Sequence, residues 1–213
     1  MILKNAMSSI YADLLNYRRC VAEMYARVRN SDLDHAATCQ RFRRERDELL
    51  RTHPQSPLSD EQKAAFKAID YFAYDATLRF VLPVDANVEA EDFELDLQDD
   101  GVMRMRRFGK IHFTVEDAAV SLSLFWIVGY GGGVFLPFRD ATSNHETYGG
   151  GRYLLDTIKH ADLGQEDSKL VIDFNYAYNP SCAYNDMYSC PVPPWENRLK
   201  VAIRAGEKLY EQY

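Results

Sequence analysis

The sequence predicts an α+β protein in which N-terminal helices pack on a mainly antiparallel β body, a barrel or sandwich of about seven or eight strands. Before Tyr71, apolar side chains recur every three or four positions, as they do along one face of a helix. After Tyr71, short alternating runs are separated by turn residues at fairly even spacing. This pattern is typical of an antiparallel sheet rather than of a βαβ fold.

The three predicted helices span residues 8–30, 32–52 and 59–69. The first carries an apolar stripe made of Ile10, Leu14, Tyr17, Val21, Met24 and Val28. The second is strongly charged and ends before Pro54, because the residue that precedes a proline resists the α conformation. The third begins with Ser59 as N-cap and Gln62 in the capping-box position.

The predicted strands span residues 77–83, 92–97, 101–115, 151–158, 169–178 and 198–205, with two hairpin strands within 120–138 that join at "GYGGG" (129–133). We expect the strand at 101–115 to bend at Gly109. The uncharged run at 120–138 is about long enough to cross a bilayer. Its side chains nevertheless alternate with strand period, so the sequence predicts a hairpin rather than a membrane span.

We divide the chain into a helical segment, 1–72, packed on a β-rich body, 73–213, within one folding unit. The net charge of −7 argues against a nucleic-acid or membrane partner, since both prefer a basic surface. The first residues lack the apolar stretch of a signal peptide, and four cysteines are too few for a disulfide framework. We therefore expect a cytoplasmic protein, and a homo-oligomer remains open.

Metal and nucleotide sites are not expected. The five histidines are scattered, and Cys182 and Cys190 are spaced too widely for a usual zinc-binding pair. The glycine clusters at 129–133 and 149–151 are not followed by a phosphate-loop Lys-Ser/Thr or by a predicted helix, so we interpret them as turns. The sequence predicts no bound metal and no cofactor.

The cysteines allow several interpretations. Cys20 and Cys39 lie inside predicted helices and are expected to be ordinary packed thiols. Cys182 and Cys190 could join across a short loop, but a disulfide would not persist in a reducing cytosol. We favour thiols packed beneath tyrosines, with a catalytic role for Cys182 as an alternative.

Charged residues crowd the segment "LPFRDATSNHETYGGGRY" (136–153). Arg139 or Arg152 could simply pair with Asp140 or Glu146 and tie this loop to the sheet. Alternatively, these groups rim a pocket in which a spare arginine binds a carboxylate or phosphate. Glu146 could then act as an acid or base if burial raised its pKa.

Three blocks of the sequence resemble a known prokaryotic family, domain of unknown function 1684. They are "RDELLRTHPQSPLSDEQKAAF", "LPFRDATSNHETYGGGRYL" and "VIDFNYAYNPSCAYNDMYSCPVPPWENRLKVAIRAGEK", which together reach from about Arg46 to Lys208. The resemblance implies that the two dense loops belong together as family hallmarks in a soluble prokaryotic protein. It implies no activity, and it places His145 at a variable position, which argues against mechanisms that use His145.

We expect loops 138–153 and 175–198 to converge over one end of the β body and form a pocket. Its predicted ligand-binding residues are Arg139, Tyr148, Arg152, Tyr153, Asn175, Tyr178, Asn179, Tyr184, Trp195 and Glu196. The favoured function is binding of a small anionic or aromatic molecule. One alternative is a hydrolase-like enzyme that uses Glu146 or Asp140 as acid/base, or Cys182 as nucleophile. Another is that both loops are purely structural.

Overall fold

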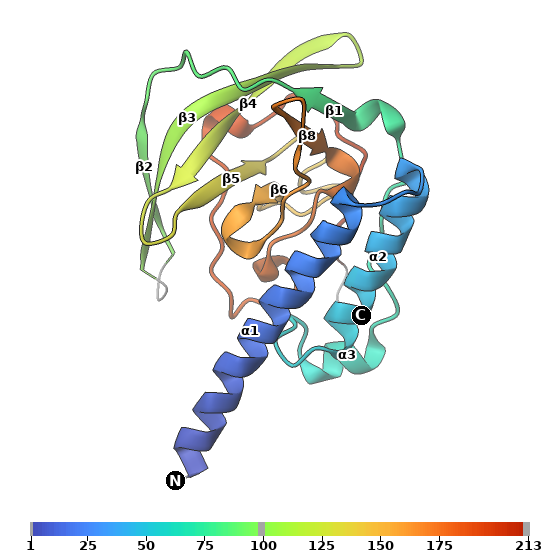
Figure 1. Ribbon diagram of the computed structural model, residues 1–213, viewed down its shortest axis with the longest axis vertical. Helices are drawn as coiled ribbons and strands as arrows, with labels where there is room; N and C mark the ends of the chain where they lie inside the picture. The colour runs from blue at the N-terminus through green and yellow to red at the C-terminus, as the bar shows by residue number, and fades with distance from the viewer. Residues whose placement is uncertain (1, 98–100, 211–213) are drawn as a thin grey trace.

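The computed structural model describes residues 2–97 and 101–210, with side chains from Ser9 onward, and has the predicted α+β architecture (Figure 1). The helices are α1 (Ile2–Arg29), α2 (His35–Thr52) and α3 (Asp60–Ala65). The strands are β1 (Arg79–Leu82), β2 (Asp92–Asp96), β3 (Val102–Val115), β4 (Ala118–Ile127), β5 (Gly133–Phe138), β6 (Arg152–Asp156), β7 (Gln165–Glu166) and β8 (Lys169–Asp173). None of the described helices has the length and apolar character needed to cross a membrane.

The strands form two antiparallel sheets, with orders β2-β3-β4-β5-β6 and β1-β8-β7. Both sheets contribute to one apolar core, in which Leu122 and Leu124 of the larger sheet pack with Ile172 of the smaller sheet. The hairpin predicted within 120–138 is confirmed as β4 and β5. Neither sheet closes on itself within the described residues, so the barrel alternative is wrong and the body consists of two packed sheets.

β3 bends where the sequence predicts. The register between β3 and β4 shifts between Arg107 and Gly109, as happens at a β-bulge. A side chain at Gly109 would overlap with Val84 and approach the backbone of Asp85, which exchanges backbone hydrogen bonds with Lys110. Glycine is therefore needed at this position because another segment of backbone crosses β3 closely.

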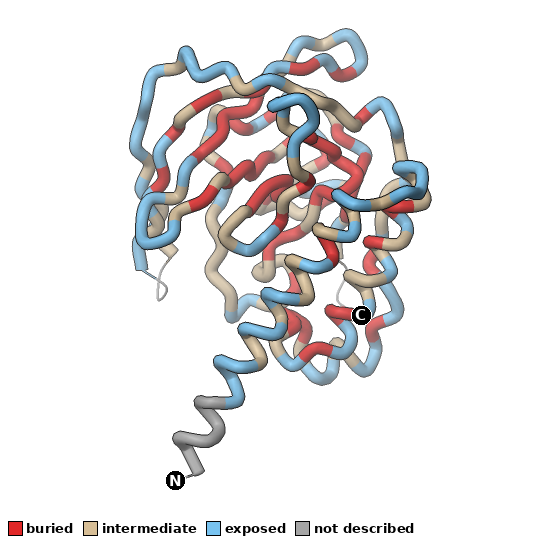
Figure 2. Tube along the Cα trace, viewed as in Figure 1, coloured by how far each residue is buried: buried red, intermediate tan, exposed pale blue. Residues whose placement is uncertain are grey.

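The helices pack on the body through the predicted apolar stripe. Met24 and Tyr25 of α1 and Phe42 of α2 form a cluster with Val171 and Tyr176 of the body. The N-terminal half of α1 extends beyond the body (Figure 1), and its described residues are mostly exposed (Figure 2). α2 ends at Thr52, as predicted.

The capping box that starts α3 is confirmed. Ser59 accepts a hydrogen bond from the Gln62 backbone, and the Gln62 side chain accepts one from the Ser59 backbone. α3 ends at Ala65, earlier than predicted. Beyond it, the backbone N–H of Ile69 donates to Asp47 of α2 at 3.0 Å, so a side chain of α2 takes the place of a further helical turn.

Asp47 provides a pH-dependent prediction. Burial raises the pKa of Asp47 to about 6. Because this folded-state pKa lies above that of an unfolded aspartate, protonated Asp47 stabilises the folded state relative to ionised Asp47. This contribution is complete at low pH and is lost as the pH rises through about 6. Asp47→Asn keeps the acceptor for Ile69 and removes the charge. We expect it to raise the free energy of unfolding by about 1–2 kcal/mol near pH 8, with little change near pH 4.

Urea unfolding of the wild type and the variant at both pH values measures this effect. Glu48→Gln is the matched control, since Glu48 neighbours Asp47 on α2 but its side chain is exposed and pairs with Arg51. A stability gain for Asp47→Asn that was equal at both pH values would contradict the assignment.

The predicted strand at 198–205 is wrong. This segment makes only one isolated bridge with the rest of the sheet region, between Arg139 and Arg198. The carbonyls of Ile203, Ala205 and Glu207 instead accept hydrogen bonds from the Arg152 side chain. The strand predicted at 169–178 stops at Asp173, because the Asp173 carboxylate caps the following 3-10 helix, η4 (Phe174–Tyr176).

Candidate functional site

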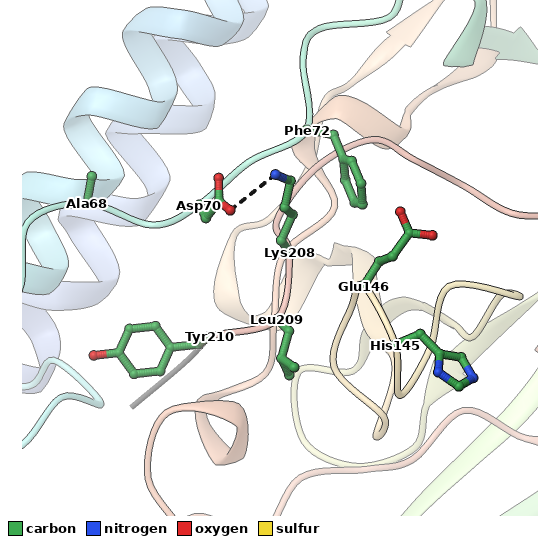
Figure 3. Close-up of a pocket in the computed structure, with 8 residues that line it drawn as sticks. All are labelled: Ala68, Asp70, Phe72, His145, Glu146, Lys208, Leu209 and Tyr210. Atoms are coloured by element: carbon green, nitrogen blue, oxygen red, sulfur yellow. Dashed lines mark hydrogen bonds and ion pairs between the residues drawn. The ribbon is translucent and has the colours of Figure 1, made fainter. Parts of the chain in front are cut away.

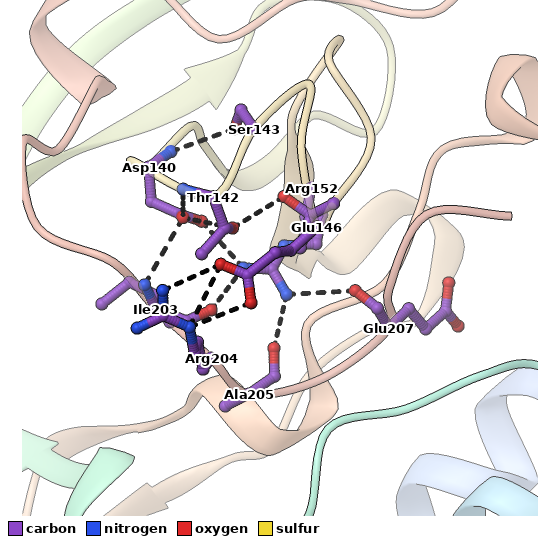
Figure 4. Close-up of polar contacts among 10 residues, drawn as sticks. Asp140, Thr142, Ser143, Glu146, Arg152, Ile203, Arg204, Ala205 and Glu207 are labelled. Carbon is purple, nitrogen blue, oxygen red and sulfur yellow. Dashed lines mark hydrogen bonds and ion pairs between the residues drawn. The ribbon is translucent and has the colours of Figure 1, made fainter.

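Asp140 and Arg152, from the first hallmark loop, meet in the core rather than on a pocket rim (Figure 4). Their side chains are 1% exposed, and Arg152 Nη2 lies 2.8 Å from Asp140 Oδ2. Asp140 Oδ1 also accepts hydrogen bonds from the backbone and hydroxyl of Thr142. Arg152 also donates to the carbonyls of Ile203, Ala205 and Glu207. Both side chains are therefore engaged in joining the first hallmark loop to the C-terminal segment.

Glu146 lies at the surface. The Arg204 guanidinium holds its carboxylate in a two-pronged pair at 2.9–3.1 Å, and this hydrogen bonding lowers the pKa of Glu146. A general acid at neutral pH would need the opposite shift. Glu146 borders a hollow of about 430 Å³ that also contains the Asp70–Lys208 ion pair (Figure 3).

Five other predicted residues are engaged elsewhere. Trp195 is 79% exposed and stacks with Arg198, while Glu196 accepts a hydrogen bond from Arg107 at 2.6 Å. Asn175 is buried, and its side chain exchanges two hydrogen bonds with the backbone of Asp75. The backbone of Arg139 pairs with Asn197 and Leu199, and the Tyr148 hydroxyl donates to the Cys182 sulfur. These residues do not line a common cavity among those described.

The remaining four predicted residues do share a cavity, of about 500 Å³, which we call the tyrosine cavity. They are Tyr153, Tyr178, Asn179 and Tyr184. Residues of α1 and α2 form the opposite wall. Tyr17 and Tyr25 of α1 and Tyr188 of the body bring the number of tyrosines that line the cavity to six. The volume falls within the range of small-molecule sites.

Glu207 lies behind the cavity wall and joins three of the lining residues. Its carboxylate accepts hydrogen bonds from Arg46 Nε, from the Tyr184 hydroxyl at 2.7 Å and from the Asn179 backbone at 2.7 Å. The Arg46 guanidinium also stacks over the Tyr178 ring, 5.2 Å from its centroid. The buried Arg46–Glu207 pair therefore has further hydrogen-bond partners, and it connects α2 to the second hallmark loop.

The polar atoms of the cavity wall are mostly neutral donors and acceptors. Burial raises the pKa of Tyr25, Tyr178 and Tyr184, so their hydroxyls stay protonated at neutral pH. Asn179 is 2% exposed, and its Oδ1 has no hydrogen-bond partner among the described residues. This amide oxygen is itself buried, on a residue that lines the cavity.

Three cationic side chains line the cavity, Arg18 and Lys159 at exposed positions and Arg46 inside. None of its described lining residues is Asp or Glu. Arg46 is neutralised by Glu207, and Lys159 Nζ lies 3.7 Å from Asp156. Arg18 makes no ion pair with any described residue. Arg18 therefore places one unpaired positive charge at the exposed rim of the cavity, on a protein of net charge −7.

Sequence reasoning missed the helical wall and Glu207. Leu14, Tyr17 and Val21 follow the three-and-four spacing of a packing stripe, and that spacing is the same whether a residue meets a neighbour or a cavity. Arg46 belongs to a strongly charged helix, in which nothing local separates it from the surface arginines.

Comparison with known proteins identifies the family. Residues 64–208 match the family described as "Protein of unknown function (DUF1684)", so the match ends where predicted and begins later, within α3. The chain is 32% identical to the uncharacterized protein from gene locus rrnAC0354 of Haloarcula marismortui, whose solution NMR structure superposes with a TM-score of 0.56.

That similarity covers 81% of this chain and 92% of the Haloarcula marismortui protein. A search of the curated proteins finds no match. The α1 and α2 wall of the tyrosine cavity precedes the region matched to the family, whereas the wall that carries Tyr178 and Tyr184 lies inside it. On the family match and the Haloarcula marismortui similarity together, the chain belongs to the DUF1684 family.

Proposed function

We propose that this protein binds a small anion with an apolar or aromatic body in the tyrosine cavity. The observation that carries the proposal is the composition of the wall, with six tyrosines, three cations and no described carboxylate. In a protein with seven more acidic than basic residues, a cavity without acidic lining favours an anionic ligand.

The wall offers suitable chemistry for the body of such a ligand. Tyrosine rings provide large apolar faces, and their neutral hydroxyls can donate or accept hydrogen bonds. A few polar groups in a largely aromatic wall are typical of small-molecule sites.

The charged group of the ligand would lie near the entrance. Arg46 already has Glu207 as its partner, so it adds little net charge to the cavity. Arg18 and Lys159 are exposed at the rim, on α1 and on η3 (Thr157–Lys159). A carboxylate or sulfonate placed between these two elements would reach cationic donors without the cost of full burial.

The proposal predicts charge-dependent binding of an aromatic anion. Fluorescence titration with anilinonaphthalene sulfonate measures its dissociation constant for the wild type and for Arg18→Glu. We expect the substitution to weaken binding about tenfold, since an attractive charge near the sulfonate is replaced by a repulsive one. Neutral N-phenylnaphthylamine, which has similar rings but no sulfonate, should bind both proteins equally.

Arg19→Glu is the matched control, because Arg19 is the next residue of α1, is exposed and does not line the cavity. Equal weakening by Arg18→Glu and Arg19→Glu would show a general surface effect and contradict the proposal. Val21→Trp, which adds an indole to the cavity wall, should weaken binding of both probes. Undiminished binding of both probes to Val21→Trp would place them outside the cavity.

A further inference from the structure

Cys182 and Cys190 lie side by side at the edge of the tyrosine cavity. Cys182 belongs to η5 (Ser181–Ala183), and its backbone N–H donates to the Cys190 sulfur at 3.3 Å. Both cysteines are partly exposed and reduced, so the pair is accessible to small reagents.

The surrounding contacts hold this pair in place. Backbone hydrogen bonds from Asn185 to Ser181 and from Tyr188 to Asn185 fold the connecting loop into tight turns. Beyond Cys190, the carbonyl of Pro191 accepts a hydrogen bond from the buried Tyr153 hydroxyl at 2.7 Å. The contact between the Cys182 N–H and the Cys190 sulfur therefore keeps the two cysteines next to each other in the folded chain.

The two thiols differ chemically. The neighbouring Cys190 thiol is the main cause that lowers the pKa of Cys182 to about 7, and the Tyr148 hydroxyl donates a hydrogen bond to the Cys182 sulfur at 3.5 Å. The same thiol–thiol contact raises the pKa of Cys190. A thiolate that forms near neutral pH beside a protonated thiol is the arrangement of an attacking and a resolving cysteine.

We infer that Cys182 and Cys190 form a redox-active dithiol whose substrate class is low-molecular-weight disulfides. The Cys182 thiolate attacks one sulfur of the disulfide, forms a mixed disulfide and releases the other half as a thiolate. Cys190 gives up its proton to solvent or to that thiolate and attacks the Cys182 sulfur. This second step releases the remaining half as a thiolate, and the two released thiolates take up the two protons that Cys182 and Cys190 gave up, so the protein loses two hydrogens and the small disulfide gains them.

The remaining cysteines lack this arrangement. Cys39 is fully buried, donates to the carbonyl of Asn175, and has its pKa raised to about 11 by burial. Cys20 lies on α1, where its thiol contacts Asn16. Cys20 therefore serves as an internal reference for a partly exposed thiol without a neighbouring cysteine partner.

Oxidation of the full-length reduced protein by glutathione disulfide near pH 7.5 tests the inference. Samples are quenched with N-ethylmaleimide and digested with trypsin, which leaves both cysteines in one peptide, residues 170–198. We expect this peptide to lose two hydrogens and take up no maleimide, while the peptides that contain Cys20 and Cys39 stay alkylated. No ligand is involved, so the result is independent of the proposed binding function.

Single substitutions assign the roles. Cys190→Ser should retain one glutathionyl group on Cys182, because the resolving thiol is missing. In Cys182→Ser, Cys190 should react with glutathione disulfide at least about tenfold more slowly than Cys182 does in Cys190→Ser. Equal rates in the two variants, or an equally fast reaction of Cys20, would overturn the inference, as would a wild-type mixed disulfide that never resolves.

A second measurement covers variants that fail to fold. Limited alkylation of the wild type with substoichiometric iodoacetamide should modify Cys182 before Cys190. Reversal of that order would also overturn the assignment of Cys182 as the attacking thiol.

Discussion

Arg152→Gln is expected to lower the free energy of unfolding by about 3–5 kcal/mol, as measured by urea denaturation. The substitution leaves the Asp140 carboxylate charged and 1% exposed without its partner. It also removes the donors for the carbonyls of Ile203, Ala205 and Glu207. A buried acceptor that loses its donor costs far more than the average hydrogen bond contributes, so these losses reinforce one another.

Two further variants test this explanation. Arg204→Gln removes an arginine from the same pair of segments, but its partner Glu146 is exposed, and we expect stability to change little. Combining Asp140→Asn with Arg152→Gln should recover part of the loss, because no unpaired charge then remains in the core. A small effect of Arg152→Gln, comparable with that of Arg204→Gln, would show that the buried pair is not needed for folding.

The elements that could be predicted from the sequence are those with local causes. The capping box of α3 joins Ser59 to Gln62, three positions away, and the bend of β3 follows from a glycine within the strand. Strand-period alternation over 120–138 likewise predicts the β4–β5 hairpin. In each case the interacting groups are close in sequence or are described by one period.

The segment at 198–205 shows where such reasoning stops. Its burial does alternate as predicted, with Leu199, Ile203 and Ala205 buried and Arg204 exposed. The hydrogen-bond partners are nevertheless the side chain of Arg152 rather than a neighbouring strand. An alternating pattern predicts which side chains are buried, but it carries no information about what satisfies the backbone.

The candidate site divides in the same way. The sequence brings Tyr153, Tyr178, Asn179 and Tyr184 into one predicted pocket, and the structure places all four in the tyrosine cavity. It does not reveal that Arg46 meets Glu207, which is 161 positions away. Asp140 and Arg152 carry equally strong chemical signals, but they lie in the core because each finds its partner in the other.

Gly206, next to Glu207, explains how the acidic side chain reaches its position. Gly206 has a φ of +75°, and a side chain there would overlap with the backbone of Ala177 and Phe174. The C-terminal segment can therefore approach the second hallmark loop closely enough for the Glu207 backbone to donate to Ala177 at 2.9 Å.

Glu207→Gln is expected to lower the free energy of unfolding by about 3–5 kcal/mol, because it leaves the Arg46 charge without a partner at a buried position. Glutamine keeps one acceptor oxygen but turns an NH₂ group toward Arg46, Tyr184 or the Asn179 backbone, all of which are donors. Glu166→Gln is the control, since Glu166 also pairs with an arginine but is half exposed, and it should cost less than about 1 kcal/mol.

A double-mutant cycle with Arg46→Met separates the pair from its surroundings. If the Arg46–Glu207 contact carries the effect, the coupling energy should be about 2 kcal/mol or more, and the double variant should be more stable than Glu207→Gln alone. Additive effects would instead assign the loss to Tyr184 and the Asn179 backbone. Because Arg46, Tyr184 and Asn179 all line the tyrosine cavity, a coupled result would mean that one buried carboxylate both stabilises the fold and sets the shape of the site.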